Sequence, residues 1–116
     1  MNDANDRFRS WLIEVLDVLT WPADQQLDYI RGLGVGIDEM ALQFDDAFRI
    51  AINKVDERSL DAETFDLLKR IDERFGVMTK QGGSVWNEEG LSRSSEWQDI
   101  RALATEARSK LNDGGA

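Results

Sequence analysis

Two pairs of acidic residues have the type and spacing that metal binding requires. Glu63 and Asp66 are three positions apart, and so are Glu96 and Asp99. Residues at i and i+3 share one face of a helix, so each pair would present its two carboxylates together. Carboxylate oxygens are ligands that Mg²⁺ prefers, and two such pairs facing each other across a groove could hold the ion. The spacing therefore defines one hypothesis, a magnesium site between two helices.

The arrangement resembles the metal-binding acids of the all-α nucleotide pyrophosphohydrolases. The resemblance implies a Mg-dependent nucleotide hydrolase in which Glu63, Asp66, Glu96 and Asp99 hold the metal. That family prefers Glu-x-x-Glu in the first pair, and Asp66 departs from this pattern. The 29 residues between the pairs are also many, and no nearby cluster of Lys and Arg predicts a phosphate clamp. In a chain with 23 acids such pairs arise easily by chance, so the hydrolase is kept as an alternative.

Other reaction types are restricted by composition. The chain has no histidine and no cysteine, which excludes serine–histidine chemistry, imidazole or thiolate metal sites and thiol nucleophiles. Asp38-Glu39 and Asp45-Asp46 lack the alternating acids, central Gly and terminal Glu of a calcium-binding EF-hand loop. We expect these acids to lie on solvated helix faces, and we expect a non-catalytic protein without a cofactor.

The net charge is −9 at pH 7, with a pI near 4.4. Such a charge disfavours direct binding to nucleic acid, because phosphates are repelled, and suits a basic protein partner. The alternative is that the acidity only keeps the domain soluble. Residues 36–75 hold 11 acidic and 6 basic side chains, a net of −5. More than half of the excess charge therefore falls in this part of the chain.

The longest helical pattern lies between Ile37 and Val55. Nine apolar residues fall within an arc about 140° wide when the stretch is drawn as a helix. They are Ile37, Met40, Ala41, Phe44, Ala47, Phe48, Ala51, Ile52 and Val55. The pattern predicts an amphipathic helix whose inner face lies at the centre of the core.

Further stretches with helical periodicity span residues 6–19, 22–33, 60–75 and about 94–111. In the second of these, Leu27, Ile30 and Leu33 are predicted to face inward. The segment 76–93 is predicted as a wide loop that Trp86 anchors. We therefore predict a single all-α domain over residues 1–116, a compact bundle of four to five amphipathic helices. Its ordered part is expected to span about 5–111, with 112–116 as a tail.

The ends of these helices carry recognisable signals. Pro22 fits the first position of the second helix. The glycines at 32, 34 and 36 could suggest a phosphate-binding loop, but no strand precedes them and no Lys-Ser/Thr follows, so they predict a helix end and a tight corner. The other predicted helix ends are an N-cap at Asn5 or Asp6, an N-cap at Ser59 or Asp61, a C-cap at Gly76, and a capping box from Ser95 to Gln98.

Two apolar residues, Leu42 and Ile50, lie on the otherwise polar side of the central helix, residues 37–55. They fall on the side that also carries Asp46 and Arg49. Either this helix is buried on both sides, or the two residues are exposed and form a protein-binding surface among acids. The second explanation predicts a partner-binding surface with an apolar centre and a charged rim. Its residues are Leu42, Asp45, Asp46, Arg49, Ile50, Asp66 and Glu73.

This small, acidic, cysteine-poor chain with several Trp and a predicted helical fold resembles the immunity proteins of bacterial polymorphic toxin systems. The stretches that carry the resemblance are Ile37-Asp38-Glu39-Met40-Ala41-Leu42-Gln43-Phe44-Asp45-Asp46 and Ser95-Glu96-Trp97-Gln98-Asp99-Ile100-Arg101. The likeness is one of general character and assigns no residue roles. It implies a cytosolic protein that plugs a basic toxin domain, often a nuclease, with an acidic surface. A close variant is an acidic protein that mimics DNA.

No apolar run approaches the length of about 18 residues that a membrane-spanning helix needs. The N-terminus lacks a basic start and an apolar segment, so we expect no secretory signal and a cytoplasmic location. A third hypothesis is a structural subunit whose outer apolar residues close a homodimer. The sequence leaves the oligomeric state open.

Overall fold

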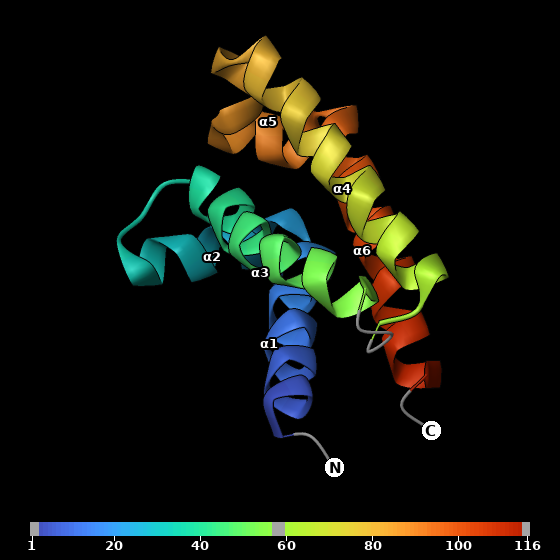
Figure 1. Ribbon diagram of the computed structural model, residues 1–116. Helices are drawn as coiled ribbons and strands as arrows, with labels where there is room; N and C mark the ends of the chain where they lie inside the picture. Colours follow the sequence, from blue (N-terminus) through green and yellow to red (C-terminus); the bar gives the residue numbers. More distant parts are fainter. Residues whose placement is uncertain (1–2, 57–59, 115–116) are drawn as a thin grey trace.

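The computed structural model describes residues 3–56 and 60–114, and it describes side chains over 7–54 and 60–111. Within these residues the chain forms six α-helices, one 3-10 helix and no strand (Figure 1). The all-α class is confirmed, with one α-helix more than the four to five predicted. The elements are α1 (Asp3–Thr20), α2 (Ala23–Leu33), α3 (Asp38–Asp56), α4 (Ala62–Gln81), η1 (Gly83–Trp86), α5 (Glu88–Arg93) and α6 (Ser95–Gly114).

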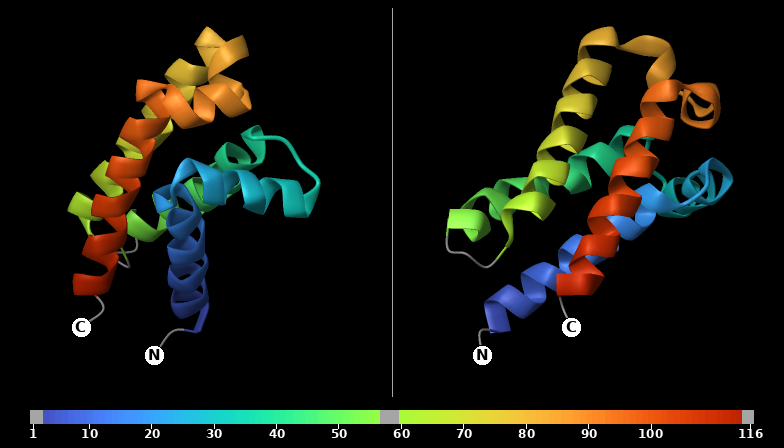
Figure 2. Two further views of the ribbon diagram at one scale, coloured as in Figure 1. Left: turned by 180° about the vertical axis from the view of Figure 1, so that it is seen from behind. Right: turned by 90° about the vertical axis from the view of Figure 1, so that its right-hand side faces the viewer.

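Four long helices surround the core. α6 packs along both α1 and α4, and α3 packs against α1 and α4. α4 and α6 run antiparallel and are joined by η1 and α5, while the start of α1 and the end of α6 lie at the same end of the molecule (Figure 2). One cluster of buried apolar side chains fills the space between these helices. Among the described residues, no helix combines the length and the apolar character needed to cross a membrane.

The inner face of α3 is buried largely as its periodicity predicts. Phe44 contacts Phe75 with ring centroids 5.8 Å apart, and Phe48 stacks on Phe65 at 5.7 Å, so α3 and α4 are joined by aromatic rings. Burial of side chains this large contributes about 1.5–3 kcal/mol each. Ile52, in contrast, is 44% exposed. It lies at the edge of the predicted apolar arc. The side chain of Val55 lies outside the described residues.

The prediction for α2 is wrong at its last residue. Ile30 is buried and Leu27 is half-buried, but Leu33 is 53% exposed. The reason is that α2 ends there: Gly34 adopts a left-handed conformation with φ 72° and donates its N–H to the Arg31 carbonyl. The chain turns away before any neighbour reaches Leu33. The predicted helix end at this glycine-rich corner is confirmed.

The fourth helix is longer than predicted. Gly76 lies inside α4, which continues to Gln81 because Met78 extends the buried apolar face by one more turn. The helix ends at Gly82, whose φ is 65° and whose N–H bonds the Met78 carbonyl. At the other end, the Asp61 side chain accepts a hydrogen bond from the Thr64 N–H at 2.8 Å, which confirms Asp61 as a cap. Ser59, the other predicted cap, lies outside the described residues.

The predicted loop over 76–93 is wrong, because most of this segment is helical. η1 and α5 fold back on each other, and Gly90 makes this possible. A Cβ at Gly90 would lie 2.1 Å from the Ser84 carbonyl oxygen, so only glycine fits against η1. Trp86 anchors the segment as predicted: its indole N–H donates to the Met78 carbonyl at 3.1 Å, and its ring stacks on Phe75.

Three other helix ends differ from the predictions by a few residues. α1 begins at Asp3, so Asn5 and Asp6 lie within the helix. Pro22 precedes α2 as its N-cap. α6 is capped by Ser94, whose hydroxyl accepts the Trp97 N–H at 3.2 Å, and the expected Ser95–Gln98 box is not used. α6 then continues to Gly114, and residues 115–116 lie outside the description.

A buried glutamine joins several of these elements. Gln26 is fully buried, and its amide donates to the carbonyls of Val18 and Leu19 at the end of α1. Its oxygen accepts two hydrogen bonds from the Arg101 guanidinium, and Arg101 also donates to the Leu91 carbonyl. Burial lowers the pKa of Arg101 from its ordinary value. These contacts fix the short helices α2 and α5 against α1 and α6.

Candidate functional site

The outer face of α3 exposes the two apolar residues that broke its sequence pattern. Leu42 is 54% exposed and Ile50 is 41% exposed. Asp46 and Arg49 are exposed on the same face. Of the two explanations left open by the sequence, burial on both sides is therefore wrong. α3 has one buried face and one outer face, and the apolar pair lies on the outer one.

The charged residues of this face differ in their surroundings. Asp45 pairs with Arg49 at 2.9 Å across one turn of α3. Asp45 also lies toward α4, where burial raises the pKa of the Asp72 carboxyl, and the charges of Asp45 and Glu73 raise it further. Asp46 lies on the other side of α3, toward α1 and α2. The two adjacent acids therefore extend the α3 face in opposite directions.

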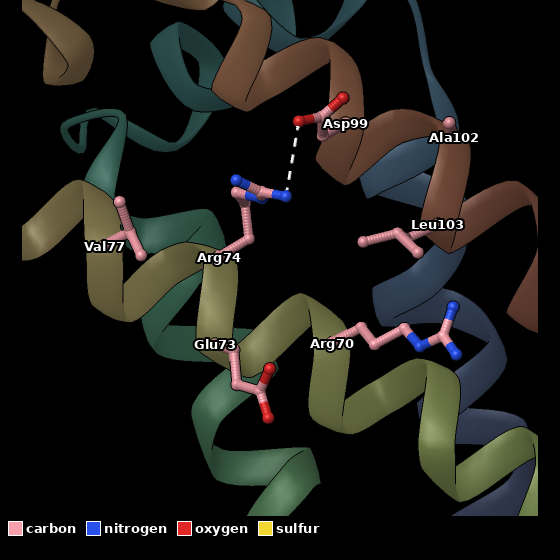
Figure 3. Close-up of a pocket in the computed structure, with 7 residues that line it drawn as sticks. All are labelled: Arg70, Glu73, Arg74, Val77, Asp99, Ala102 and Leu103. Atoms are coloured by element: carbon pink, nitrogen blue, oxygen red, sulfur yellow. Dashed lines mark ion pairs between the residues drawn. The ribbon is translucent and has the colours of Figure 1, made fainter.

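Asp66 and Glu73, the two rim residues predicted on α4, lie apart from the α3 face. Glu73 lines a groove of about 470 Å³ between α4 and α6, together with Arg70 and Arg74 (Figure 3). Figure 3 shows Arg74 reaching across this groove toward Asp99, with an N–O distance of 3.6 Å. Asp66 pairs with Arg70 at 3.1 Å across one turn of α4. Asp66 and Glu73 both lie on the side of α4 that faces α6. They therefore do not form one continuous rim with the α3 face.

The four acids of the magnesium hypothesis are not brought together. Glu63 pairs with Lys110 at 2.8 Å, and Asp99 pairs with Arg74. Because α4 and α6 are antiparallel, the first acidic pair lies near the end of α6 and the second near its start. Glu63 and Arg74 are about 16 Å apart along α4 at a rise of about 1.5 Å per residue. Among the described residues, no group of three or more acids could hold a metal ion. The arrangement expected from the nucleotide pyrophosphohydrolases is therefore absent from this part of the chain.

A pocket between α1, α2 and α3 was missed by the sequence reasoning. It has a volume of about 520 Å³, and it borders the α3 face because Asp46 belongs to both. Three aromatic and three acidic side chains line it, with Val15, Val18 and Gln43 between them. The six are Trp11, Trp21, Tyr29, Glu14, Asp17 and Asp46.

The walls of this pocket are held by contacts of their own. Trp21 meets Tyr29 edge to face, with ring centroids 5.6 Å apart and planes at 82°. The Tyr29 hydroxyl donates to the Gln43 side chain at 3.2 Å, and Asp17 pairs with Arg108 of α6 at 2.6 Å. The sequence offered a weak signal for this site, since Trp21 directly precedes a helix-breaking proline. Periodicity alone does not show which half-buried aromatic residues meet across a corner.

Comparison with known proteins assigns no role to these surfaces. No protein-family model matches the chain, and no curated protein or solved structure matches it significantly. The interpretation of the α3 face and of the neighbouring pocket therefore rests on their own chemistry.

Proposed function

We propose that this chain is a cytoplasmic, non-catalytic domain that binds a basic protein partner through the outer face of α3. The type of protein that fits this role is an immunity- or antitoxin-type inhibitor of a toxin or of another protein that acts on nucleic acid. One observation carries the proposal. Leu42 and Ile50 are exposed on the same helix face as Asp46, whereas most other apolar residues of α3 are buried.

An apolar centre with a polar rim is the usual organisation of a protein-binding surface. Two large aliphatic side chains that point into water gain free energy when a partner covers them. The adjacent acids and the net charge of −9 attract a basic partner over long range and raise its association rate. Binding by steering and then docking fits this combination of residues.

The alternative of a homodimer uses the same apolar pair. Two copies brought together through α3 would place Asp46 and Asp45 of each chain near an interface, and each chain carries a net charge of −9. Repulsion between like charges opposes this association. We therefore expect a monomer in solution at physiological ionic strength. A measured molecular mass of twice 13.2 kDa that falls when Leu42 is changed to Asp would instead establish the dimer.

The test of the proposal is a charge reversal on the α3 face. A partner that co-purifies with the chain is isolated, and its affinity is measured for the wild type and for Asp46→Lys. We expect Asp46→Lys to weaken binding by about 1 kcal/mol or more, roughly fivefold. Glu106→Lys is the matched control, because it changes the net charge equally from an exposed position on α6. An affinity that is insensitive to salt and equal for both variants would contradict the proposal.

A further inference from the structure

The pocket between α1, α2 and α3 combines aromatic walls with negative charge. Trp11, Trp21 and Tyr29 are half-buried, so part of each ring remains accessible. Glu14 and Asp46 are exposed and carry their charges at the opening. None of the described residues that line the pocket is a lysine or an arginine. Arg108 reaches Asp17 from α6, which leaves the lining acids with a negative balance.

We infer that this pocket receives an arginine side chain of the protein partner. An arginine guanidinium is planar, stacks on aromatic rings and bonds carboxylates through a fixed fork of donors. The pocket presents both groups at once, with ring planes at nearly a right angle and acids beside them. Its volume of about 520 Å³ accommodates a long side chain. A neutral or anionic group would leave the exposed acids uncompensated.

The position of the pocket supports the same occupant. Asp46 lies on the α3 face and also lines the pocket, so the two surfaces are continuous. A partner that covers Leu42 would place neighbouring basic residues within reach of the aromatic walls. The contacts that hold Tyr29 and Trp21 in place mean that little ordering is needed when the cation enters. This inference rests on the proposed function and names the chemical group that anchors the partner.

The first test uses a small probe in place of the partner. Nα-acetyl-arginine amide is titrated into the protein while the four indole N–H signals are followed by NMR. We expect the signals of Trp11 and Trp21 to shift, with a dissociation constant on the order of millimolar, while those of Trp86 and Trp97 stay in place. The uncharged analogue Nα-acetyl-citrulline amide has nearly the same shape and should cause no shift. Equal shifts with the citrulline probe, or no shift with the arginine probe, would overturn the inference.

Variants separate the two components of the pocket. Trp21→Leu should weaken binding of the arginine probe about fivefold, because it removes one aromatic wall. Glu14→Gln should weaken it about twofold. Glu14 is exposed, so this variant tests the pocket without altering the core of the fold. Glu106→Gln on α6 removes the same charge outside the pocket and should have no effect. Probe affinity that is unchanged in Glu14→Gln and Trp21→Leu, with both variants folded by circular dichroism, would contradict the assignment.

Failure of this inference can be told apart from failure of the proposed function. Leu42 belongs to the α3 face and is not part of the pocket. If the partner loses affinity for Leu42→Asp but binds Trp21→Leu and Glu14→Gln as tightly as the wild type, the arginine pocket is wrong and the binding face stands. If Leu42→Asp binds the partner normally, the proposed function itself is wrong.

Discussion

The side-chain oxygen of Gln26 accepts two hydrogen bonds from the guanidinium of Arg101, at 3.2 and 3.0 Å. Gln26 belongs to α2 and Arg101 to α6, so this contact joins residues 75 positions apart in the chain. The glutamine has no access to water, and it therefore depends on Arg101 for this partner. Tyr29 of α2 lines the pocket between α1, α2 and α3, so this contact, which holds α2 in place, helps to set the geometry of the pocket.

Replacing Arg101 by methionine should lower the free energy of unfolding by about 1–3 kcal/mol. The substitution keeps much of the side-chain volume but leaves the buried oxygen of Gln26 without its donor. Denaturation by urea, followed by circular dichroism, measures the change. Arg93→Met is the control, since Arg93 is exposed on α5 and only pairs with Glu89 at 3.8 Å. A loss for Arg101→Met no larger than for Arg93→Met would contradict the role given to the network.

Alanine at two glycines should have opposite effects on stability. Gly90→Ala would place a Cβ against the backbone of η1, and separating these elements should cost more than about 2 kcal/mol. Gly76→Ala should raise the free energy of unfolding by about 0.5–1 kcal/mol, because Gly76 lies inside α4 with nothing near its missing Cβ. Thermal or urea denaturation distinguishes the two. If Gly76→Ala were destabilising, the helix would end at Gly76 as the sequence suggested.

Removing the charge of Asp72 should stabilise the protein at neutral pH. Burial, together with Asp45 and Glu73, raises the pKa of this carboxyl above its ordinary value of 3.8 in the folded state. Below pH 3.8 the carboxyl is protonated in both the folded and the unfolded state, so it does not lower the free energy of unfolding. As the pH rises through the folded-state pKa, the charged carboxyl lowers the free energy of unfolding. Asp72→Asn should be more stable than the wild type at pH 7, and the difference should shrink as the pH falls toward 3.8. Urea titrations at several pH values measure this, and a gain that grows toward low pH would have the wrong sign.

Binding kinetics should separate the charged and apolar parts of the α3 face. Asp46→Asn should lower the association rate constant several-fold at low salt and reduce its dependence on ionic strength. Leu42→Ala should instead raise the dissociation rate constant, because the apolar contact forms only after docking. Surface plasmon resonance with the purified partner at several salt concentrations resolves the two constants. A salt-independent effect of Asp46→Asn on dissociation alone would argue against steering.

The amino-acid sequence predicted what depends on local periodicity. Phe44 and Phe48 are buried in the helical core, as the periodicity predicts, whereas the break in the pattern at Leu42 and Ile50 left open whether these residues are exposed. A helical sequence pattern records which side of a helix is apolar, and this information survives without knowledge of the neighbours. It was sufficient for the fold class and for most of the buried face of α3.

The predictions that failed depended on contacts between distant residues. Glycine often ends a helix, but α4 continues beyond Gly76 because Met78 adds a buried apolar side chain in the next turn. Glu63 and Asp66 line the same surface of α4, as predicted, but Glu96 and Asp99 line different ones. The antiparallel packing also separates Glu63 from Asp99. The meeting of Trp21 with Tyr29, like that of Gln26 with Arg101, follows from the angle between helices, which periodicity does not encode.

The packing of α1 along α6 has a consequence for synthesis on the ribosome. The apolar stripe of α1, with Leu12 and Leu16 at its centre, is buried, and α6 and α3 are the helices that pack most extensively along α1. α1 is made before α6, so a growing chain carries this stripe without α6 until translation of residues 95–111 is complete. We expect nascent chains that stop before α6 to bind chaperones or to be degraded, because α6 packs against both α1 and α4 and is needed to complete the core.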